Sequence, residues 1–293
     1  MTVIGSKPSG TTRDQGREPP MDTVFRIRRA PVLFAAILIA LGAVAVGCAS
    51  RPSTASTEAA TAGIPVLHPT VVATLDHDTQ AWTEGLEIAD GVLYESTGLT
   101  GRSELRKLDP NTGAVLHRTP LPTNLYGEGI TVLGDRIWQL TYRNEVALRW
   151  TGDAVNSPVP YPGEGWGLCH TDTGRLIASD GTDRLRLLSP DDLAQVGSIA
   201  VTIHGRALSG FNELDCGGGN TVLANIYPTG WLAQISLPDG KVTALVDATR
   251  LLPPDLPRST DVLNGIAAIP GTDQFLLTGK LWPHMYRVRF AQG

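Results

Sequence analysis

The sequence predicts an all-β fold, a five-bladed β-propeller closed by an N-terminal strand. Three observations lead to this prediction. From Ile64 onward, short apolar runs alternate with Gly, Pro, Asp and Asn, and no long stretch shows helical periodicity. A unit of one polar residue, Gly and one apolar residue recurs, most clearly in Gly127-Glu-Gly-Ile130. Finally, a spare strand precedes the first repeat, and the last repeat is one strand short.

The recurring unit gives the blade count. Its polar residues are taken to be Glu84, Glu128, Glu164, Glu213 and Asn264, with spacings of 44, 36, 49 and 51 residues. A period in this range is typical of repeat architectures, and about four strands fit in each unit. Five repeats that each place a polar side chain at one point of a strand would form a ring of such side chains. We interpret this ring as the candidate active site.

Each repeat contains two hairpins, which together make one four-stranded blade. In the first repeat, residues 85–96 form a hairpin around Asp90-Gly91, and residues 104–119 form another around Asp109–Gly113. The later repeats turn at similar clusters of Gly, Pro, Asp and Thr. The same element order therefore recurs along the chain.

The closure of the ring follows from counting strands. The last repeat runs out after His284–Phe290, whereas Val71–Leu75 is a spare strand before the first repeat. Antiparallel pairing of these two segments would complete the last blade without leaving an exposed edge. We therefore expect one propeller domain over residues 64–293.

The N-terminus predicts export. Arg26-Ile-Arg-Arg29 precedes an uncharged apolar run that ends in Ala45-Val-Gly-Cys48, which is similar to a bacterial lipobox. Residues 1–48 would then be a signal peptide, and Cys48 would carry the lipid. An uncleaved anchor is the alternative, and a true start at Met21 would give a signal of ordinary length. We expect a protein that is anchored to the outer face of the bacterial cell membrane, or secreted.

Composition narrows the class of protein further. Residues 49–63 are rich in Ser, Thr, Ala and Pro, which predicts a disordered tether. The chain has 24 Lys and Arg against 29 Asp and Glu, and it becomes more acidic without residues 1–48. This balance argues against nucleic acid as a partner, because phosphate binding needs basic patches. Cys169 and Cys216 are an even pair in an exported chain, so a disulfide or two buried thiols are the alternatives.

A series of ordered motifs covers residues 76–290. They are Thr83-Glu-Gly-Leu-Glu87, Leu93–Gly98, Gly101-Arg-Ser103, Gly127-Glu-Gly129, Gln139–Tyr142, Tyr161–Leu168, Ser179-Asp-Gly181, Asn212-Glu-Leu214, Ala224-Asn225, Asp261–Ala267 and Thr278–Pro283. Together they resemble the plant-type glutamine cyclotransferases, a family that also occurs in bacteria. The resemblance implies a five-bladed propeller that converts N-terminal glutaminyl residues of peptides or proteins to pyroglutamyl. It also implies that ammonia is released and that no metal or other cofactor takes part.

In such a reaction the α-amine attacks the side-chain amide carbon of its own residue. The enzyme must fix the reactive rotamer, move a proton and stabilise an oxyanion. The resemblance places the family's catalytic Glu at Glu128 and an active-site lysine at Lys280. Glu128 would transfer the proton, Lys280 would steady the oxyanion or the amide oxygen, and Asn212 would hydrogen-bond the substrate's amide or backbone. The expected substrate-binding residues are Trp82, Glu84, Gln139, Tyr142, Glu164, Trp166, Tyr227, Asn264 and Trp282. Each residue also has a purely structural alternative. Glu128 would cap backbone N–H groups, Lys280 would be solvated, Asn212 and Asn264 would lie in turns, and Trp166 would pack in the core.

The chain departs from the family pattern near the ring. Glu84 stands where members commonly have Gln, and Trp82 stands where they have Phe. Tyr142 and Tyr227 stand where Trp is common, which exchanges an indole N–H for a phenol O–H. A second carboxylate at Glu84 would raise the pKa of a neighbouring acid or attract the substrate's ammonium group. Narrowed specificity or weak activity would follow.

Two other functions fit a ring of polar side chains. A lactonase-type propeller would use Glu84, Glu128, Glu164 and Asn264 to bind a divalent cation, although that class normally has six blades. A non-catalytic binding propeller at the cell surface would carry the same repeats. The sequence contains no Ser/His/Asp triad pattern, phosphate loop or Cys/His zinc spacing. We expect a monomer.

Overall fold

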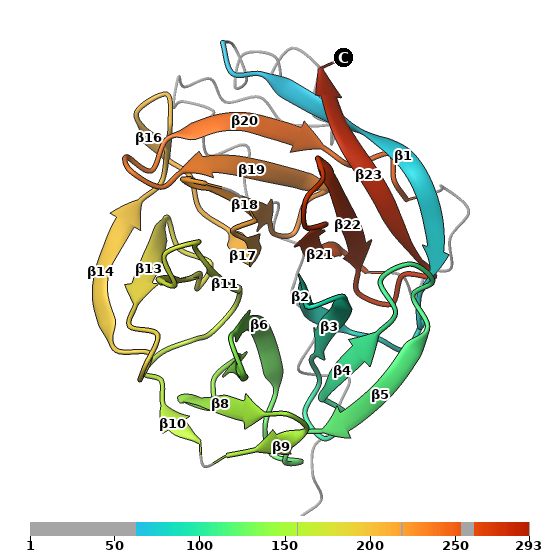
Figure 1. Ribbon diagram of the computed structural model, residues 1–293. Coiled ribbons are helices and arrows are strands. Elements are labelled where there is room, and N and C mark those ends of the chain that lie inside the picture. The colour runs from blue at the N-terminus through green and yellow to red at the C-terminus, as the bar shows by residue number, and fades with distance from the viewer. Residues whose placement is uncertain (1–62, 157, 218, 253–260, 293) are drawn as a thin grey trace, which may run out of the picture. The chain divides into compact units, whose positions relative to one another are not determined.

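The computed structural model describes residues 63–156, 158–217, 219–252 and 261–292, which belong to one compact unit. Every regular element assigned within these ranges is a β-strand (Figure 1). The signal peptide, Cys48 and nearly all of the tether lie outside the described residues. Within the described ranges, no helix is long and apolar enough to cross a membrane.

The strands fall into groups that follow the chain. The bounds are β1 Val66–Asp76, β2 Thr83–Ala89, β3 Val92–Thr97, β4 Glu104–Leu108, β5 Val115–Pro120, β6 Gly127–Leu133, β7 Arg136–Thr141, β8 Val146–Thr151, β9 Ala154–Val155, β10 Val159–Pro160, β11 Leu168–His170, β12 Leu176–Ala178, β13 Arg184–Leu188, β14 Gln195–Ala200, β15 Thr202–Ile203, β16 Arg206–Ala207, β17 Phe211–Asp215, β18 Thr221–Ile226, β19 Trp231–Ser236, β20 Val242–Asp247, β21 Leu263–Ala268, β22 Gln274–Gly279 and β23 His284–Gln292. The groups are β2–β5, β6–β8 with β9 and β10, β11–β14, β17–β20, and β21–β23 with β1.

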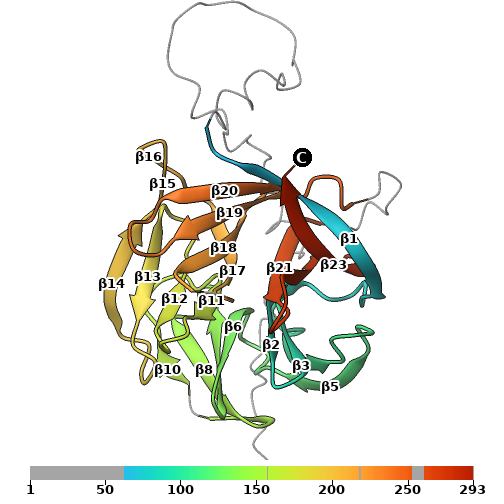
Figure 2. The same cartoon turned by 45° about the horizontal axis from the view of Figure 1, so that its top comes forward.

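These groups lie around a common centre, as the blades of a propeller do (Figures 1 and 2). The innermost strands β2, β6, β11, β17 and β21 contact one another in turn, and β21 returns to β2. The all-β propeller expected from the sequence is therefore confirmed. The count of five blades stays a prediction, because β1 joins the last two groups into one eight-stranded sheet.

The expected closure by an N-terminal strand is confirmed. β1 pairs antiparallel with β23, with Val71 opposite Val288 and Leu75 opposite Met285. Figure 2 shows the two strands side by side. The start of β1 also pairs parallel with β20, where Val66 lies opposite Leu245. β1 therefore covers the outer edges of two neighbouring groups, which removes both as exposed edges.

The core is divided among the interfaces between neighbouring groups. One buried apolar cluster lies between each pair of adjacent groups, including the pair that closes the ring. Successive residues of one strand enter different clusters, because side chains alternate across a strand. On β7, for example, Ile137 packs toward β2–β5 and Trp138 packs toward β11–β14. This alternation fixes the register of each strand and with it the position of the inner strands.

A disulfide links two inner strands. Cys169 of β11 and Cys216, which directly follows β17, are bonded with their Cα atoms 5.5 Å apart. Both side chains are buried in the cluster between β11–β14 and β17–β20. The bond closes a loop across a sequence separation of 47 residues. In the chain-entropy account, a cross-link of this span stabilises the fold by about 4 kcal/mol.

Candidate active site

A β-bulge interrupts four of the inner strands at the recurring motif. The pairing register shifts at Glu84 in β2, at Glu128 in β6, at Asn212 in β17 and at Asn264 in β21. A bulge leaves the extra residue out of the ladder and re-aims its side chain. The bulges therefore release these four polar side chains from the regular alternation that buries their neighbours.

Glycine after the bulged residue lets the inner strands approach one another. A Cβ atom added at Gly85 would lie 2.8 Å from the backbone nitrogen of Ile130 on the next inner strand. A Cβ at Gly129 would overlap the carbonyl oxygen of Trp166, to which Gly129 N donates a hydrogen bond of 2.7 Å. Any side chain at these positions would push the ring apart. The recurring Glu-Gly pair is thus a packing requirement as well as a source of carboxylates.

The same close approach corrects the repeat assignment. A Cβ at Gly167 would overlap the carbonyl oxygen of Asn212, so Gly167 is the third glycine of this kind. Trp166, rather than Glu164, therefore stands at the repeat position before β11. In β17 the position belongs to Asn212 rather than Glu213. The expected equivalence of Glu164 and Glu213 with the other acids is wrong, and the residues at the repeat positions are Glu84, Glu128, Trp166, Asn212 and Asn264.

Glu84 is the most densely hydrogen-bonded member of the ring. Its carboxylate accepts contacts of 2.7 Å from Lys280 Nζ on each oxygen. The Tyr126 hydroxyl donates to it at 2.8 Å, and Asn264 Nδ2 donates at 3.1 Å. Burial raises the pKa of Glu84, whereas the Lys280 ammonium and the Tyr126 hydroxyl act in the opposite direction. With these donors and an adjacent cation, Glu84 is the ionised member of the site.

Glu128 lies beside Glu84 and is 5% exposed. Its carboxyl group is within hydrogen-bonding reach of the Glu84 carboxyl group. Burial and the negative charge of Glu84 raise the pKa of Glu128 well above its usual range, while Lys280 opposes the shift. This shift favours the protonated form of Glu128.

Lys280 supplies the positive charge of the site. It directly follows β22, and its side chain is 8% exposed. Burial lowers the pKa of Lys280, but Glu84 and Glu128 outweigh that effect and raise it, so the ammonium group stays charged. Its Nζ atom lies 5.2 Å from the ring centroid of Trp82 and 5.9 Å from that of Tyr227. Both distances suit a cation over an aromatic face.

An arc of half-buried aromatic rings surrounds this cluster. Tyr126 and Tyr142 have their ring centroids 5.6 Å apart, and Tyr142 lies 6.5 Å from Trp166. Trp166 in turn meets Tyr227 edge to face at 5.8 Å. The structure thus brings together three of the expected aromatic residues. Tyr126 was missed by the sequence reasoning, although it directly precedes the Gly-Glu-Gly motif.

Two buried amide oxygens lack a protein partner in the described part of the chain. They are Oδ1 of Asn212 and Oδ1 of Asn264. The amide nitrogen of Asn264 donates hydrogen bonds to Thr83 O at 3.0 Å and to the Glu84 carboxylate. Buried polar atoms are nearly always hydrogen-bonded, so these two oxygens are acceptors suited to a bound ligand.

Glu164 lies at the rim and not in the buried cluster. Its carboxylate accepts a 2.6 Å hydrogen bond from Arg143 Nε and a 3.1 Å bond from Trp166 Nε1. The side chains of Glu164 and Arg143 are 33% and 66% exposed. Glu164 therefore orients the Trp166 ring. Two of the four ligands expected for a lactonase-type cation site, Glu84 and Glu164, already have a cationic side chain as partner.

Two expected substrate-binding residues have structural roles instead. The amide of Gln139 is fully buried, donating to Ser96 Oγ at 2.7 Å and accepting from Trp150 Nε1 at 3.0 Å. Trp282 is 1% exposed and donates from Nε1 to Asp261 O at 2.9 Å. Its ring fills the space beside Gly279, where a Cβ would overlap the indole. Gln139 joins neighbouring strands, and Trp282 supports the turn that carries Lys280.

A second set of largely buried carboxyl groups lies on the inner strands β2 and β17. Glu213 accepts a 3.2 Å hydrogen bond from Leu86 N, and Asp215 accepts one of 2.6 Å from Ala268 N. Glu87 accepts one of 3.2 Å from Val132 N. Each bond joins one inner strand to the backbone of another, so these carboxyl groups cross-link the ring.

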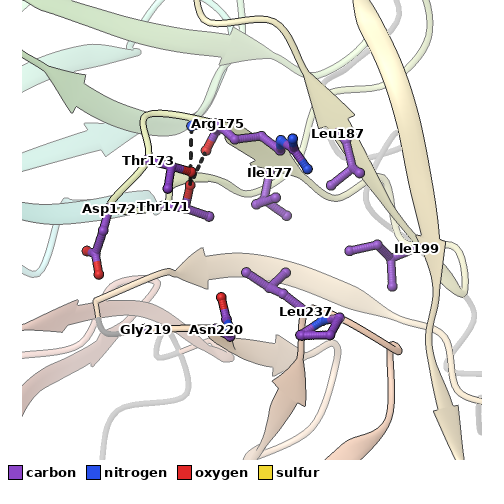
Figure 3. A pocket seen from close by; sticks show the side chains of 11 residues that line it. Thr171, Asp172, Thr173, Arg175, Ile177, Leu187, Ile199, Gly219, Asn220 and Leu237 are labelled. Atoms are coloured by element: carbon purple, nitrogen blue, oxygen red, sulfur yellow. Dashed lines mark hydrogen bonds between the residues drawn. The ribbon is translucent and has the colours of Figure 1, made fainter.

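A cavity of about 430 Å³ lies away from the ring, between β11–β14 and β17–β20 (Figure 3). Its apolar lining comes from Ile177, Leu187, Ile199 and Leu237, and threonines lie on its rim. None of the ring residues lines it. The cavity therefore does not contain the candidate chemistry.

Comparisons with known proteins show the family to which the chain belongs. A family model described as glutamine cyclotransferase matches residues 41–290. The chain belongs to the glutamine cyclotransferase family. A glutaminyl-peptide cyclotransferase of Arabidopsis thaliana is 34% identical over 229 residues, which are 76% of this chain and 71% of that protein. The crystal structure of Myxococcus xanthus glutaminyl cyclase matches with a TM-score of 0.72 at 32% identity, and covers 78% of this chain and 99% of its own.

Proposed function

We propose that this member of the glutamine cyclotransferase family is a glutaminyl-peptide cyclotransferase. It would convert the N-terminal glutaminyl residue of peptides or proteins to a pyroglutamyl residue and release ammonia. The observation that carries this proposal is the buried cluster of Glu84, Glu128 and Lys280 inside an aromatic wall. These side chains supply a proton carrier, an oxyanion partner and an apolar surface, so the proposed reaction uses no cofactor.

Glu128 would carry the proton between the two nitrogens. The neutral α-amine attacks the side-chain amide carbon, which gives an intermediate with a positive ring nitrogen and a negative oxygen. Protonated Glu128 donates its proton to the amide nitrogen, and the resulting carboxylate accepts a proton from the ring nitrogen. Collapse of the oxyanion expels ammonia and restores the carbonyl. Glu128 ends the cycle protonated, as it began.

The other residues would hold the reacting groups. The Lys280 ammonium stabilises the oxyanion, which is worth most in a buried site. The free oxygens of Asn212 and Asn264 accept hydrogen bonds from the substrate's amide and amine groups. Tyr142, Trp166 and other rings of the arc enclose the methylene groups, as the apolar walls of small-ligand sites do. This arrangement fixes the rotamer that brings the amine to the amide carbon.

The test is mass spectrometry of a peptide with N-terminal Gln after incubation with the purified protein. We expect loss of ammonia well above the spontaneous rate. The matched control is the same peptide with an acetylated α-amine, which has no nucleophile and should remain unchanged. Failure of the free peptide to cyclise faster than without enzyme would overturn the proposal.

We also propose that the protein is exported, anchored by lipid on Cys48, and monomeric. The support for the anchor is the sequence around Arg26–Arg29 and Ala45–Cys48. Fractionation of cells that express Cys48→Ser should find the protein released from the membrane or left as precursor. Normal processing and membrane attachment of this variant would contradict the anchor.

A further inference from the structure

We propose that Glu84 and Glu128 act as a carboxyl pair that holds a single proton, with Glu84 as the positioning residue that keeps this proton on Glu128. The catalytic use of the pair rests on the proposed function. The existence of the pair can be tested without any substrate.

The hydrogen bonds of Glu84 decide which carboxyl group carries the proton. A carboxylate has about four lone-pair sites. Lys280 and Tyr126 donate hydrogen bonds to Oε1 of Glu84, Asn264 donates one to Oε2, and the Lys280 ammonium group also lies 2.7 Å from Oε2. One acceptor site on Oε2 is left for a hydroxyl group of Glu128. These donors stabilise the ionised form and leave little room for a proton on Glu84. The proton of the pair therefore belongs to Glu128, whose hydroxyl donates to Glu84.

The backbone holds the two groups together. Glu84 and Glu128 occupy bulges of the neighbouring inner strands β2 and β6. Gly85 and Gly129 bring these strands into backbone contact, since a Cβ at Gly85 would lie 3.0 Å from Gly129 Cα. Two buried carboxyl groups held this close together on adjacent strands do not both ionise, because their like charges repel in a medium that screens poorly.

The charged and titratable groups around Glu128 support a single proton. Glu164 adds a negative charge from the rim, and it is paired with Arg143. The hydroxyl groups of Tyr126, Tyr142 and Tyr227 also interact with Glu128, and the pKa of each is raised. Among the described residues that interact with Glu128, Lys280 is the cation, and its two short contacts are with Glu84. Glu128 thus lacks a cation of its own.

The variant Glu84→Gln separates the structural role of the Glu84 side chain from the effect of its charge on Glu128. It keeps the size of the side chain but removes the charge that holds the proton on its neighbour. Lys280 is then left to pair with Glu128, which ionises. The amide oxygen of the new side chain can still accept hydrogen bonds from Lys280 and Tyr126, which both donate to Oε1 of Glu84.

The first experiment is infrared difference spectroscopy of the protein without substrate at neutral pH. The wild type minus Glu128→Gln difference should contain the carbonyl stretch of one protonated carboxylic acid. In the Glu84→Gln background, the same Glu128→Gln difference should instead contain carboxylate bands. Carboxylate bands in the wild-type difference would overturn the proposal, even if the protein cyclises Gln-peptides normally. The wild-type difference needs only Glu128→Gln to fold.

The second experiment is the pH profile of kcat/KM for a Gln-peptide. The reactive enzyme–substrate complex has one proton in total on Glu128 and the substrate's α-amine. The pKa of the free α-amine is about 7.7–8.0. In the wild type the proton is on Glu128, so activity should rise as the amine loses its own proton. In Glu84→Gln, ionised Glu128 takes the proton from the bound ammonium group, so the active range should move to lower pH.

Glu87→Gln is the matched control, because Glu87 is on the same strand and has a pKa raised to about 8. Its profile should coincide with that of the wild type. An unshifted pH profile of Glu84→Gln, or an equal shift in Glu87→Gln, would show that Glu84 does not keep the proton on Glu128. A merely structural Glu84 would change the height of the profile and leave its position on the pH axis.

Discussion

The inner strands carry two sets of largely buried carboxyl groups with different surroundings. Glu84 and Glu128 face a lysine, a tyrosine hydroxyl and half-buried aromatic rings. Glu87, Glu213 and Asp215 accept hydrogen bonds from backbone N–H groups of neighbouring strands. The first set has side-chain partners that a substrate can displace or use. The partners of the second set are backbone N–H groups of neighbouring inner strands, so loss of these hydrogen bonds would destabilise the fold.

This difference in hydrogen-bond partners distinguishes carboxyl groups that act in catalysis from those that stabilise the fold. Burial raises the pKa of Glu213 well above its usual range, as it does for Glu128, so a shifted pKa alone does not identify the catalytic residue. What distinguishes Glu128 is the adjacent cation, the nearby free amide oxygens and the aromatic wall. We therefore expect substitutions in the first set to reduce turnover and substitutions in the second set to reduce stability.

The largest combined effect on turnover and stability is expected from Lys280→Met. The variant leaves Glu84 buried without its cation and removes the partner of the oxyanion, so kcat should fall by about 10²–10³. The protein should also lose stability, because an uncompensated buried charge is costly. Adding Glu84→Gln should restore most of the stability but not kcat, measured by denaturant unfolding and peptide cyclisation. Recovery of turnover in the double variant would contradict the role of Lys280.

Asp215→Asn tests the second set. Asp215 accepts from Gly217 N at 2.7 Å and from Ala268 N at 2.6 Å, and an amide can accept only one of these bonds. The free energy of unfolding should fall by about 1–3 kcal/mol, the cost of a buried group left unsatisfied. The kcat of the folded variant should equal that of the wild type. A selective loss of turnover at unchanged stability would place Asp215 in the chemistry.

Trp166→Ala should act on binding. Trp166 forms part of the wall and takes no proton, so KM should rise on the order of tenfold, the equivalent of about 1.4 kcal/mol. The kcat should change much less, because the reacting groups remain. Glu164→Gln is the milder companion, since it weakens the hydrogen bond that orients the Trp166 ring. A kcat loss larger than the KM change would assign Trp166 to the transition state.

The smallest expected effect concerns pH. Glu87 has a pKa raised from 4.5 to about 8, chiefly by burial, although its side chain is 16% exposed. Between these values the folded state binds more protons than the unfolded state, so stability is lost as pH rises. Glu87→Gln should make the free energy of unfolding less dependent on pH in this range. Denaturant unfolding at several pH values would show it, and an unchanged slope would contradict the shifted pKa.

The sequence predicted the closure of the ring because closure is a property of the whole chain. A missing strand after residue 290 and a spare strand at residues 71–75 leave few ways to avoid an open edge. The antiparallel pairing of these two segments is the predicted one, and the structure adds its register, with Val71 opposite Val288. The sequence also pointed to Glu128, Lys280 and Asn264, because each belongs to a distinctive short motif.

The sequence did not predict which residues share the repeat position. The sequence motifs were aligned by their acidic residues. In the structure, the equivalent residue of each repeat is the one directly before the point where two inner strands come into close backbone contact. This is why Trp166 and Asn212 replace Glu164 and Glu213 at that position. The partners of Tyr126 and Gln139 are 42 and 43 residues away in the sequence, so no local pattern shows whether each side chain faces the site or the core.

The most direct test of the account compares Glu128→Gln with Glu213→Gln in one cyclisation assay. Both residues are buried acids of inner strands with raised pKa values, so both substitutions remove a buried carboxyl group. We predict that Glu128→Gln lowers kcat by about 10²–10⁴, the usual contribution of general acid–base catalysis, with little change in stability. Glu213→Gln should keep the kcat of the wild type and unfold at a lower temperature. Turnover of Glu128→Gln within about threefold of the wild type, far less than that loss, or an equal loss in both variants, would contradict the account.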